Sequence, residues 1–155
     1  NAGPWNIRTE EMNKPILAVV DDDPDMADII QYVAEEVGFE ARVAFNAIEF
    51  QKIWHETELS AIVMDIVMPD MDGNELLLWL VEEGCSVPIL LVSGYDVKYL
   101  RAAESLGKIR GAPVVGTLRK PFAVDEVGAK LKQILETTSL RSENMSVGTN
   151  FGRRP

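Results

Sequence analysis

Cysteine is almost absent from this sequence of 155 residues, and no apolar stretch is long enough to form a membrane helix. The single cysteine, Cys85, excludes an internal disulfide and is typical of a reducing compartment, which predicts a cytoplasmic location. A membrane span needs about 20 consecutive apolar residues, and residues 1–13 lack the apolar segment of a signal peptide. We therefore expect no contact with a membrane.

Basic residues are also in deficit, because 15 Lys and Arg stand against 25 Asp and Glu and the net charge is −10. Binding to a nucleic-acid backbone requires a basic patch, so we expect this domain to contact no nucleic acid. Part of the acidity falls in two groups, and carboxylates this close in sequence repel one another unless a cation lies among them. The groups are Asp21, Asp22, Asp23 and Asp25, and then Asp65, Asp70 and Asp72.

Apolar residues alternate between short continuous runs and helical spacing, a pattern typical of an α/β domain with a parallel sheet. We predict five strands and five helices in a doubly wound arrangement, with connections short enough for right-handed crossovers. The strands are expected at residues 16–20, 40–45, 61–64, 89–92 and about 114–118. The helices are expected at 24–37, from 47 onward, at 74–82, from 97 through 106, and at 124–136.

Capping residues mark several expected helix ends. Asp23 is suited to an N-cap and Gly38 to a C-terminal stop. Asn46 with Glu49 resembles a capping box, and Asp96 can cap the fourth helix. The apolar stripe of the first helix is expected to be Met26, Ile29, Ile30, Val33 and Val37. That of the last helix is expected to be Val124, Val127, Leu131, Ile134 and Leu135.

Two segments fall outside this pattern. Residues 14–136 form the expected domain, preceded by an N-terminal extension, residues 1–13, that we expect to be flexible. Within the extension, Trp5 and Ile7 are apolar and could dock on the domain. Residues 137–155 are rich in Ser, Thr, Asn, Gly and Arg, which predicts a polar tail or a truncated linker.

Polar side chains stand at the carboxyl ends of four of the expected strands. These are Asp21 and Asp22, then Asp65, Ser93 and Lys120. Because the carboxyl ends of parallel strands meet at one edge of a sheet, we expect these groups to share a crevice. Either Ser or Lys alone would be an ordinary turn or surface residue. Their joint occurrence in this order predicts a site for a divalent cation and a phosphoryl group.

The donor types favour Mg²⁺, which prefers oxygen ligands in an octahedron and keeps some waters. Asp22 and Asp65 are the expected direct ligands, Asp21 the water-mediated one, and the Val67 backbone carbonyl a further ligand. Asp65 can also act as a nucleophile that forms an acyl phosphate. Lys120 can pair with Asp65 and then with the new phosphoryl oxygen. The hydroxyl of Ser93 can donate to that oxygen if its loop moves inward.

In these residues and their order, the chain resembles a two-component response-regulator receiver domain. The matching segments are Val-Val-Asp-Asp at 19–22, Met-Asp-Ile-Val-Met-Pro-Asp-Met-Asp-Gly at 64–73, Leu-Val-Ser-Gly at 91–94 and Lys-Pro-Phe at 120–122. The resemblance implies a flavodoxin-like receiver fold with strand order 2-1-3-4-5. It also implies that Asp65 is the phosphoacceptor, Asp21 and Asp22 the Mg²⁺-holding pair, Ser93 the switch hydroxyl and Lys120 the invariant lysine.

The resemblance further implies the partners. A sensor histidine kinase or phosphotransfer protein would phosphorylate Asp65, and the surface near the fourth and fifth helices would change its preference for a homodimer or a C-terminal output domain. Such a receiver is not an enzyme beyond its own phosphorylation and dephosphorylation. A cis peptide bond is implied before Pro121.

Two departures from the family pattern affect these expectations. Thr117 stands where receivers usually carry an aromatic residue, so the usual coupling of that ring to the switch hydroxyl is not expected. Extra residues around 104–113 make the sequence separation between Ser93 and Lys120 longer than it is in chemotaxis-type regulators. The stretches at 100–104 and 116–122 resemble receivers joined to EAL-type cyclic-di-GMP phosphodiesterases, although residues 1–155 contain no EAL signature.

Alternatives remain open at this stage. A phosphatase of the haloacid-dehalogenase type also uses an Asp at a strand end, but it needs a second acid where Val67 stands. A docking module that works without phosphorylation is a further alternative. If the chain is a receiver domain, Val67 and Tyr95 flank the path of a hydrolytic water. Apolar and aromatic side chains there should hinder that water, which predicts a long-lived phosphoryl-aspartate. His55, Cys85, Trp54 and Trp79 are expected to have no role in the chemistry.

Overall fold

Five parallel strands form a single sheet in the order β2-β1-β3-β4-β5, as expected for a receiver fold. The computed structural model describes residues 14–69, 72–94 and 96–152, the last 14 of these by their backbone alone. The strands are β1 (Ile16–Val20), β2 (Glu40–Ala44), β3 (Ala61–Asp65), β4 (Ile89–Ser93) and β5 (Val114–Arg119). The helices are α2 (Pro24–Val37), α3 (Ala47–Glu56), α4 (Gly73–Glu82), α5 (Val97–Arg110) and α6 (Val124–Gly152).

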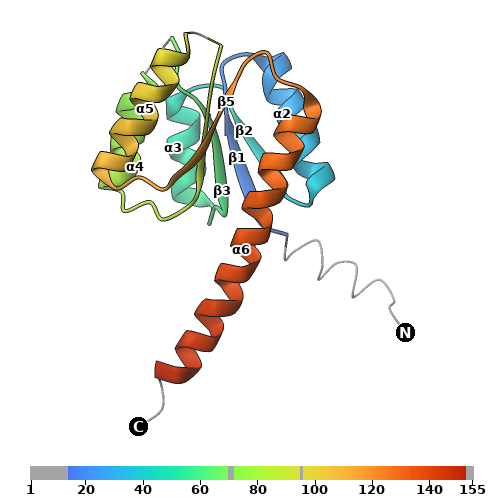
Figure 1. The fold of residues 1–155 in the computed structure, drawn as a ribbon, viewed down its shortest axis with the longest axis vertical. Helices are drawn as coiled ribbons and strands as arrows, with labels where there is room; N and C mark the ends of the chain where they lie inside the picture. Colours follow the sequence, from blue (N-terminus) through green and yellow to red (C-terminus); the bar gives the residue numbers. More distant parts are fainter. Residues whose placement is uncertain (1–13, 70–71, 95, 153–155) are drawn as a thin grey trace.

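Helices cover both faces of the sheet (Figure 1). On one face, α3, α4 and α5 pack on a core that includes Phe50, Leu77 and Leu100. On the other face, α2 and α6 pack on a second core that includes Ile30 and Leu131. Strands β1, β3 and β4 are almost completely buried, which explains why their sequences are continuous apolar runs rather than alternating ones.

Short polar side chains begin the helices where the sequence predicted them. Asp23 accepts a hydrogen bond from the backbone of Asp25, and Pro24 follows as the first helical residue. Asn46 and Asp96 cap α3 and α5 in the same manner. These caps satisfy backbone N–H groups that have no partner inside the helix. They also fix the direction in which each helix leaves the crevice edge of the sheet.

The crevice lies where the strand order of the sheet reverses. The chain passes from β1 to β2 on one side and continues through β3, β4 and β5 on the other. The carboxyl ends of β1 and β3, which are hydrogen-bonded neighbours, therefore diverge into connections on opposite sides. Ligand sites of open α/β sheets lie at such a point.

Three details differ from the sequence prediction. Helix α6 continues to Gly152 instead of ending near Glu136, because no Gly or Pro interrupts residues 129–147. Val124 is exposed, since it lies in the first turn of α6 and lines the groove towards α2 instead of the core. Ile29 is also exposed, at 40%, and the buried face of α2 is formed instead by residues that include Ala27 and Ala34.

The predicted N-terminal extension lies outside the described residues. Among the helices that the structure describes, none combines the length and the apolar character needed to cross a bilayer.

Candidate functional site

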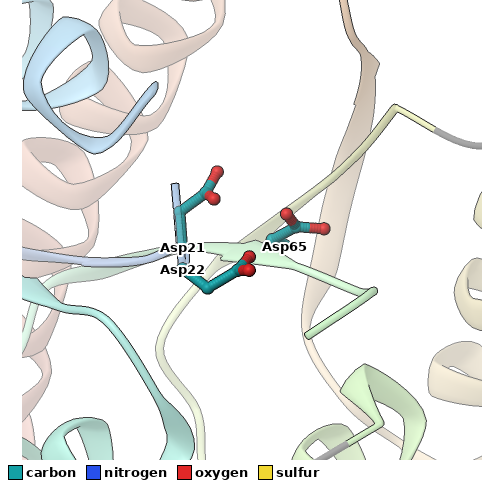
Figure 2. A group of neighbouring side chains, drawn as sticks. All are labelled: Asp21, Asp22 and Asp65. Carbon is teal, nitrogen blue, oxygen red and sulfur yellow. The ribbon is translucent and has the colours of Figure 1, made fainter. Parts of the chain in front are cut away.

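The predicted crevice forms at the carboxyl ends of the strands. Asp21 and Asp22 directly follow β1, Asp65 is the last residue of β3, and Ser93 is the last residue of β4. Lys120 follows β5 directly. Figure 2 shows the three aspartates at the neighbouring ends of β1 and β3, with the carboxylates of Asp22 and Asp65 directed to the same side. All the residues predicted to share the crevice therefore lie at one edge of the sheet.

The three carboxylates form a cluster of oxygen donors. One carboxylate oxygen from each of Asp21, Asp22 and Asp65 lies within 4.8 Å of the others. Asp21 and Asp65 are buried, with 1% and 6% of their surface exposed, whereas Asp22 is exposed. Carboxylates held this close repel one another. A divalent cation that takes oxygen ligands fits this donor set, and the exposed Asp22 leaves it accessible from solvent.

Lys120 neutralises part of this charge. Its Nζ atom lies 2.8 Å from Oδ2 of Asp21 and 3.0 Å from Oδ2 of Asp65. Burial by itself lowers the pKa of the Lys120 ammonium, but its hydrogen bonds to both carboxylates outweigh burial and raise the pKa. Lys120 is therefore a permanent cation that bridges the ends of β1 and β3. The sequence predicted the pairing with Asp65; the pairing with Asp21 was not predicted.

Asp65 is held by two hydrogen bonds. Its Oδ1 accepts from the backbone N–H of Val67 at 3.0 Å, and its Oδ2 accepts from Lys120. Burial raises the pKa of Asp65, while these hydrogen bonds lower it and the neighbouring Asp21 raises it further; the net direction is upward. A carboxylate in this state is fixed in orientation, yet it is less stabilised as an anion than a solvated one.

Ser93 is connected to Lys120 through the backbone. The serine is completely buried, and its carbonyl accepts the backbone N–H of Lys120 at 2.8 Å. The predicted donation from its hydroxyl to a phosphoryl oxygen is not tested by this geometry. The Lys120–Pro121 peptide bond is cis, as the resemblance implied. Thr117 pairs with Leu91 of β4, so it lies on the face of the sheet that α5 covers.

The loop after Asp65 is closed by a residue that the sequence prediction did not single out. The backbone N–H of Gly73 donates to the carbonyl of Ile66 at 2.9 Å, and a Cβ atom at position 73 would lie 2.3 Å from the Ile66 Cα. Only glycine allows this approach. A glycine that ends an acidic loop before a helix could have indicated such a contact.

Asp72, a member of the second acidic group, has a separate role. Asp72 accepts a hydrogen bond from the Asn74 backbone and caps α4, instead of joining Asp65. Asp70 lies outside the described residues, as does Tyr95, the second residue of the predicted water path. Val67 is half-buried beside Asp65, where its N–H is engaged; the predicted role of its carbonyl as a ligand stays a prediction.

His55 and the two tryptophans lie away from the crevice. The rings of Trp54 and His55 pack edge-on against Trp79, at centroid distances of 6.2 and 5.9 Å, on the α3–α4 side of the molecule. Cys85 is half-buried in the loop before β4, and its thiol lies 3.5 Å from the Val87 carbonyl oxygen. None of these residues contacts the carboxylates.

Comparison with protein-family models supports the resemblance to receiver domains. A family model described as the response regulator receiver domain matches residues 17–132, which include the whole crevice. The chain belongs to this family. Phosphorylation on an aspartate is the function of receiver domains, which act in two-component signalling with histidine kinases and output domains. Receiver domains bind Mg²⁺ through an acidic pocket, and this receiver domain carries such a group of aspartates.

Curated relatives are longer proteins. The receiver domain is 33% identical over 129 residues to the alkaline phosphatase synthesis transcriptional regulatory protein PhoP of Bacillus subtilis, covering 83% of this chain and 51% of that protein. It is 29% identical over 131 residues to the putative response regulator NtrX-like of Rickettsia bellii, covering 83% of this chain and 26% of that protein. The chain thus spans about a quarter to a half of these two relatives.

Solved structures agree on the fold. The receiver domain of the Francisella response regulator 1452 superposes with a TM-score of 0.69 at 28% identity, covering 80% of this chain and 98% of that one. Full-length FixJ from B. japonicum gives a TM-score of 0.71 at 27% identity, covering 88% of this chain and 65% of that one.

Proposed function

We propose that Asp65 accepts a phosphoryl group in a Mg²⁺-dependent reaction and that Asp21, Asp22, Ser93 and Lys120 assist it. One observation carries the proposal. Asp65 stands at the end of β3 with two further carboxylate oxygens within 4.8 Å and the Lys120 ammonium at 3.0 Å. A nucleophilic carboxylate, a cation site and a fixed ammonium are the groups that phosphoryl transfer to an aspartate requires.

Magnesium would be held by Asp22 and Asp65, with Asp21 behind them and the Val67 carbonyl as a further ligand. When bound, it would neutralise charge on the phosphoryl oxygens. Both oxygens of Asp21 accept hydrogen bonds, Oδ2 from Lys120 and Oδ1 from the backbone of Asp23 at 3.0 Å, and both oxygens of Asp65 are engaged in the same way by Lys120 and Val67. Asp22 is the exposed member of the group, which supports a direct ligand role for it.

The donor we propose is the phosphohistidine of a sensor kinase or phosphotransfer protein. A carboxylate oxygen of Asp65 attacks phosphorus, an O–P bond forms, and the P–N bond breaks with its electron pair going to the imidazole nitrogen. The Val67 N–H holds Asp65 in orientation through Oδ1. Lys120 stays protonated and exchanges its contact with Oδ2 for the transferred group. The hydroxyl of Ser93 then donates to a phosphoryl oxygen after a movement of its loop.

Regulation is the proposed outcome. Phosphorylation would change the contacts of a homodimer or of an output module outside these residues, in a cytoplasmic protein with no catalytic activity beyond its own phosphorylation and dephosphorylation. An EAL-type phosphodiesterase output remains a hypothesis from sequence resemblance alone. Val67 beside the acceptor favours slow hydrolysis of the acyl phosphate, because an apolar side chain cannot orient a water. Faster loss of phosphate from wild type than from Val67→Asn would contradict this.

The central test uses acetyl phosphate with Mg²⁺, followed by intact-mass measurement. Wild type should gain one phosphoryl group, and Asp65→Asn or omission of Mg²⁺ should abolish the gain. Asp72→Asn is the matched control, because Asp72 is acidic and belongs to the same loop but caps α4. An adduct that persists in Asp65→Asn would place the acceptor elsewhere. If wild type gains no phosphoryl group, the proposal is contradicted and a docking module that works without phosphorylation is the interpretation that remains.

A further inference from the structure

A cavity of about 390 Å³ lies between β5 and α6, and its volume is in the range of small-molecule sites, roughly 300–1,000 Å³. It is separate from the crevice, because it reaches Pro88, which directly precedes β4, whereas the crevice lies at the opposite ends of the strands. We call this cavity the lateral pocket. Its lining includes Pro88, Leu90, Val115, Gly116, Lys130 and Ile134.

The floor of the lateral pocket is apolar. Leu90 and Ile134 are buried residues of the core that α2 and α6 cover, and Val115 adds an apolar side chain that is 55% exposed. Gly116 is paired with Leu90 in the sheet and adds no side chain, so a Cβ atom there would meet only Leu90 Cδ1 at 3.6 Å and Lys130 Nζ at 3.8 Å. An apolar group can therefore lie over Gly116 in contact with the floor.

One wall of the lateral pocket is polar and comes from α6. Lys130, Gln133 and Thr137 all line the pocket, and their spacing of three and four residues places them on one stripe of the helix. The Thr137 hydroxyl donates to the Gln133 carbonyl at 2.9 Å, so it is engaged within the helix. The hydrogen-bond donors that this wall offers to a ligand are therefore the Lys130 ammonium and the Gln133 side-chain amide.

Lys130 carries a positive charge that has no counter-charge in the described part of the chain. Its side chain is half-buried, and no described carboxylate lies within ion-pair distance of its ammonium. Glu126, one helical turn earlier, is at the usual spacing for a partner. Its Oε1 instead accepts the backbone N–H of Ala123 at 3.3 Å, at the start of α6. A cation beside an apolar floor is stabilised by an anion that binds there.

The charges on the lining limit the kind of anion. Glu136 also lines the lateral pocket, so a dianion such as a phosphate monoester would be repelled by it more strongly than a monoanion. We propose that the lateral pocket binds a small apolar monocarboxylate, with the carboxylate on Lys130 and the apolar body over Gly116. This binding requires neither Mg²⁺ nor phosphorylation of Asp65.

Titration of the isotope-labelled full chain with phenylbutyrate, followed by NMR in the absence of Mg²⁺, tests the proposal. We expect binding in the millimolar range, with the largest amide shifts at Val115, Gly116 and Lys130. Lys130→Gln should weaken the affinity at least about tenfold, because a hydrogen bond between two charged groups is lost. Lys132→Gln is the matched control, since Lys132 is an exposed lysine of the same helix that does not line the pocket, and it should leave the affinity unchanged.

Two further probes separate the contributions of the charge and of the apolar body. Phenylbutyramide, which has the same body without the charge, should bind wild type more weakly than phenylbutyrate and should not distinguish wild type from Lys130→Gln. Acetate, which has the charge without the body, should not bind measurably. Equal affinity of phenylbutyrate for wild type and Lys130→Gln, shifts confined to the crevice, acetate binding as tight as that of phenylbutyrate, or no millimolar binding would each overturn the proposal.

Discussion

Two glycines show at the scale of single residues how the same amino acid serves different purposes. At Gly73 the backbone returns so closely to Ile66 that a Cβ atom would lie 2.3 Å from its Cα. At Gly116 the nearest atom to such a Cβ would be 3.6 Å away, which is ordinary contact. Gly73 is therefore required by a backbone approach, and Gly116 is not.

Replacement by alanine should distinguish them. We expect Gly73→Ala to lower the free energy of unfolding by roughly 2 kcal/mol, because overpacking against backbone forces the loop to shift. Gly116→Ala should change it by less than about 1 kcal/mol. Urea denaturation of both variants measures the difference. Similar losses at the two positions would show that the contact with Ile66 is readily relieved.

The thiol of Cys85 gives a pH-dependent prediction. Burial raises the pKa of Cys85 above that of an ordinary thiol. Because the thiolate is the reactive form, a higher pKa means less thiolate at any pH below it. Alkylation by iodoacetamide should therefore be slow at neutral pH and should rise tenfold per pH unit well into the alkaline range.

A cysteine in place of Glu82, the exposed last residue of α4 and three positions before Cys85, serves as the reference. Glu82→Cys in a Cys85→Ser background should reach its maximal alkylation rate at a lower pH than Cys85 does in wild type. If the two profiles coincide, burial does not control the reactivity of Cys85.

At the scale of an element, α3 shows how a helix start is determined locally. The side chain of Asn46 accepts the Glu49 backbone N–H at 2.8 Å, and Oε1 of Glu49 accepts the Phe45 N–H at 2.7 Å. Two backbone donors at the helix start are satisfied by two side chains three residues apart. This reciprocal arrangement is that of a capping box, shifted by one residue at its return bond.

Loss of the cap should be measurable in isolation. Asn46→Ala should cost about 1 kcal/mol of unfolding free energy, because a backbone N–H of α3 loses its partner. Lys52→Ala, on the exposed side of the same helix, should change stability by less than about 0.5 kcal/mol. Thermal unfolding followed by circular dichroism compares them. If the two variants lose the same stability, the cap does not stabilise α3.

The starts of the helices and the strands of the sheet could be predicted from the sequence because their causes are local. Asp23, Asn46 and Asp96 each satisfy donors two or three residues away. Burial was predicted less well. A stripe that includes Ile29 follows from periodicity, yet the position of the neighbouring helix decides which side of the stripe is covered. The end of α6 was missed because polar composition is a weaker signal than the lack of Gly or Pro.

The site could be predicted to the level of its members and not of their contacts. Strand ends bring Asp65 and Lys120 to one edge in any parallel sheet of this order. The additional bond from Lys120 to Asp21 depends on side-chain reach across 99 residues of sequence separation, which no local pattern encodes. Capping by Asp72 was likewise missed, because an acidic residue after a strand can serve either a cation or a helix.

At the scale of the whole molecule, Lys120 joins the ends of three strands. It follows β5, and its ammonium pairs with Asp21 after β1 and with Asp65 at the end of β3. Its side chain is only 15% exposed, so the pairs are largely shielded from solvent.

Removal of this cation should destabilise the entire fold. Lys120→Met without Mg²⁺ should lose roughly 3 kcal/mol of unfolding free energy, because two buried carboxylates lose their counter-charge. Millimolar Mg²⁺ should restore part of the loss, since a bound cation replaces the ammonium. The control is Lys108→Met, which breaks an exposed pair with Glu104 at 3.7 Å and should cost less than about 0.5 kcal/mol. An Mg²⁺ effect no larger than that on wild type would contradict this account.

The length of α6 gives the molecule a mechanical property. The helix continues for 16 residues beyond Glu136, about 24 Å, and its far end extends away from the sheet and the other helices (Figure 1). A rotation of about 10° where α6 packs on the sheet would displace that far end by roughly 4 Å, by the geometry of a rod of this length. Small rearrangements around Leu131 and Ile134 would therefore produce larger displacements at Gly152.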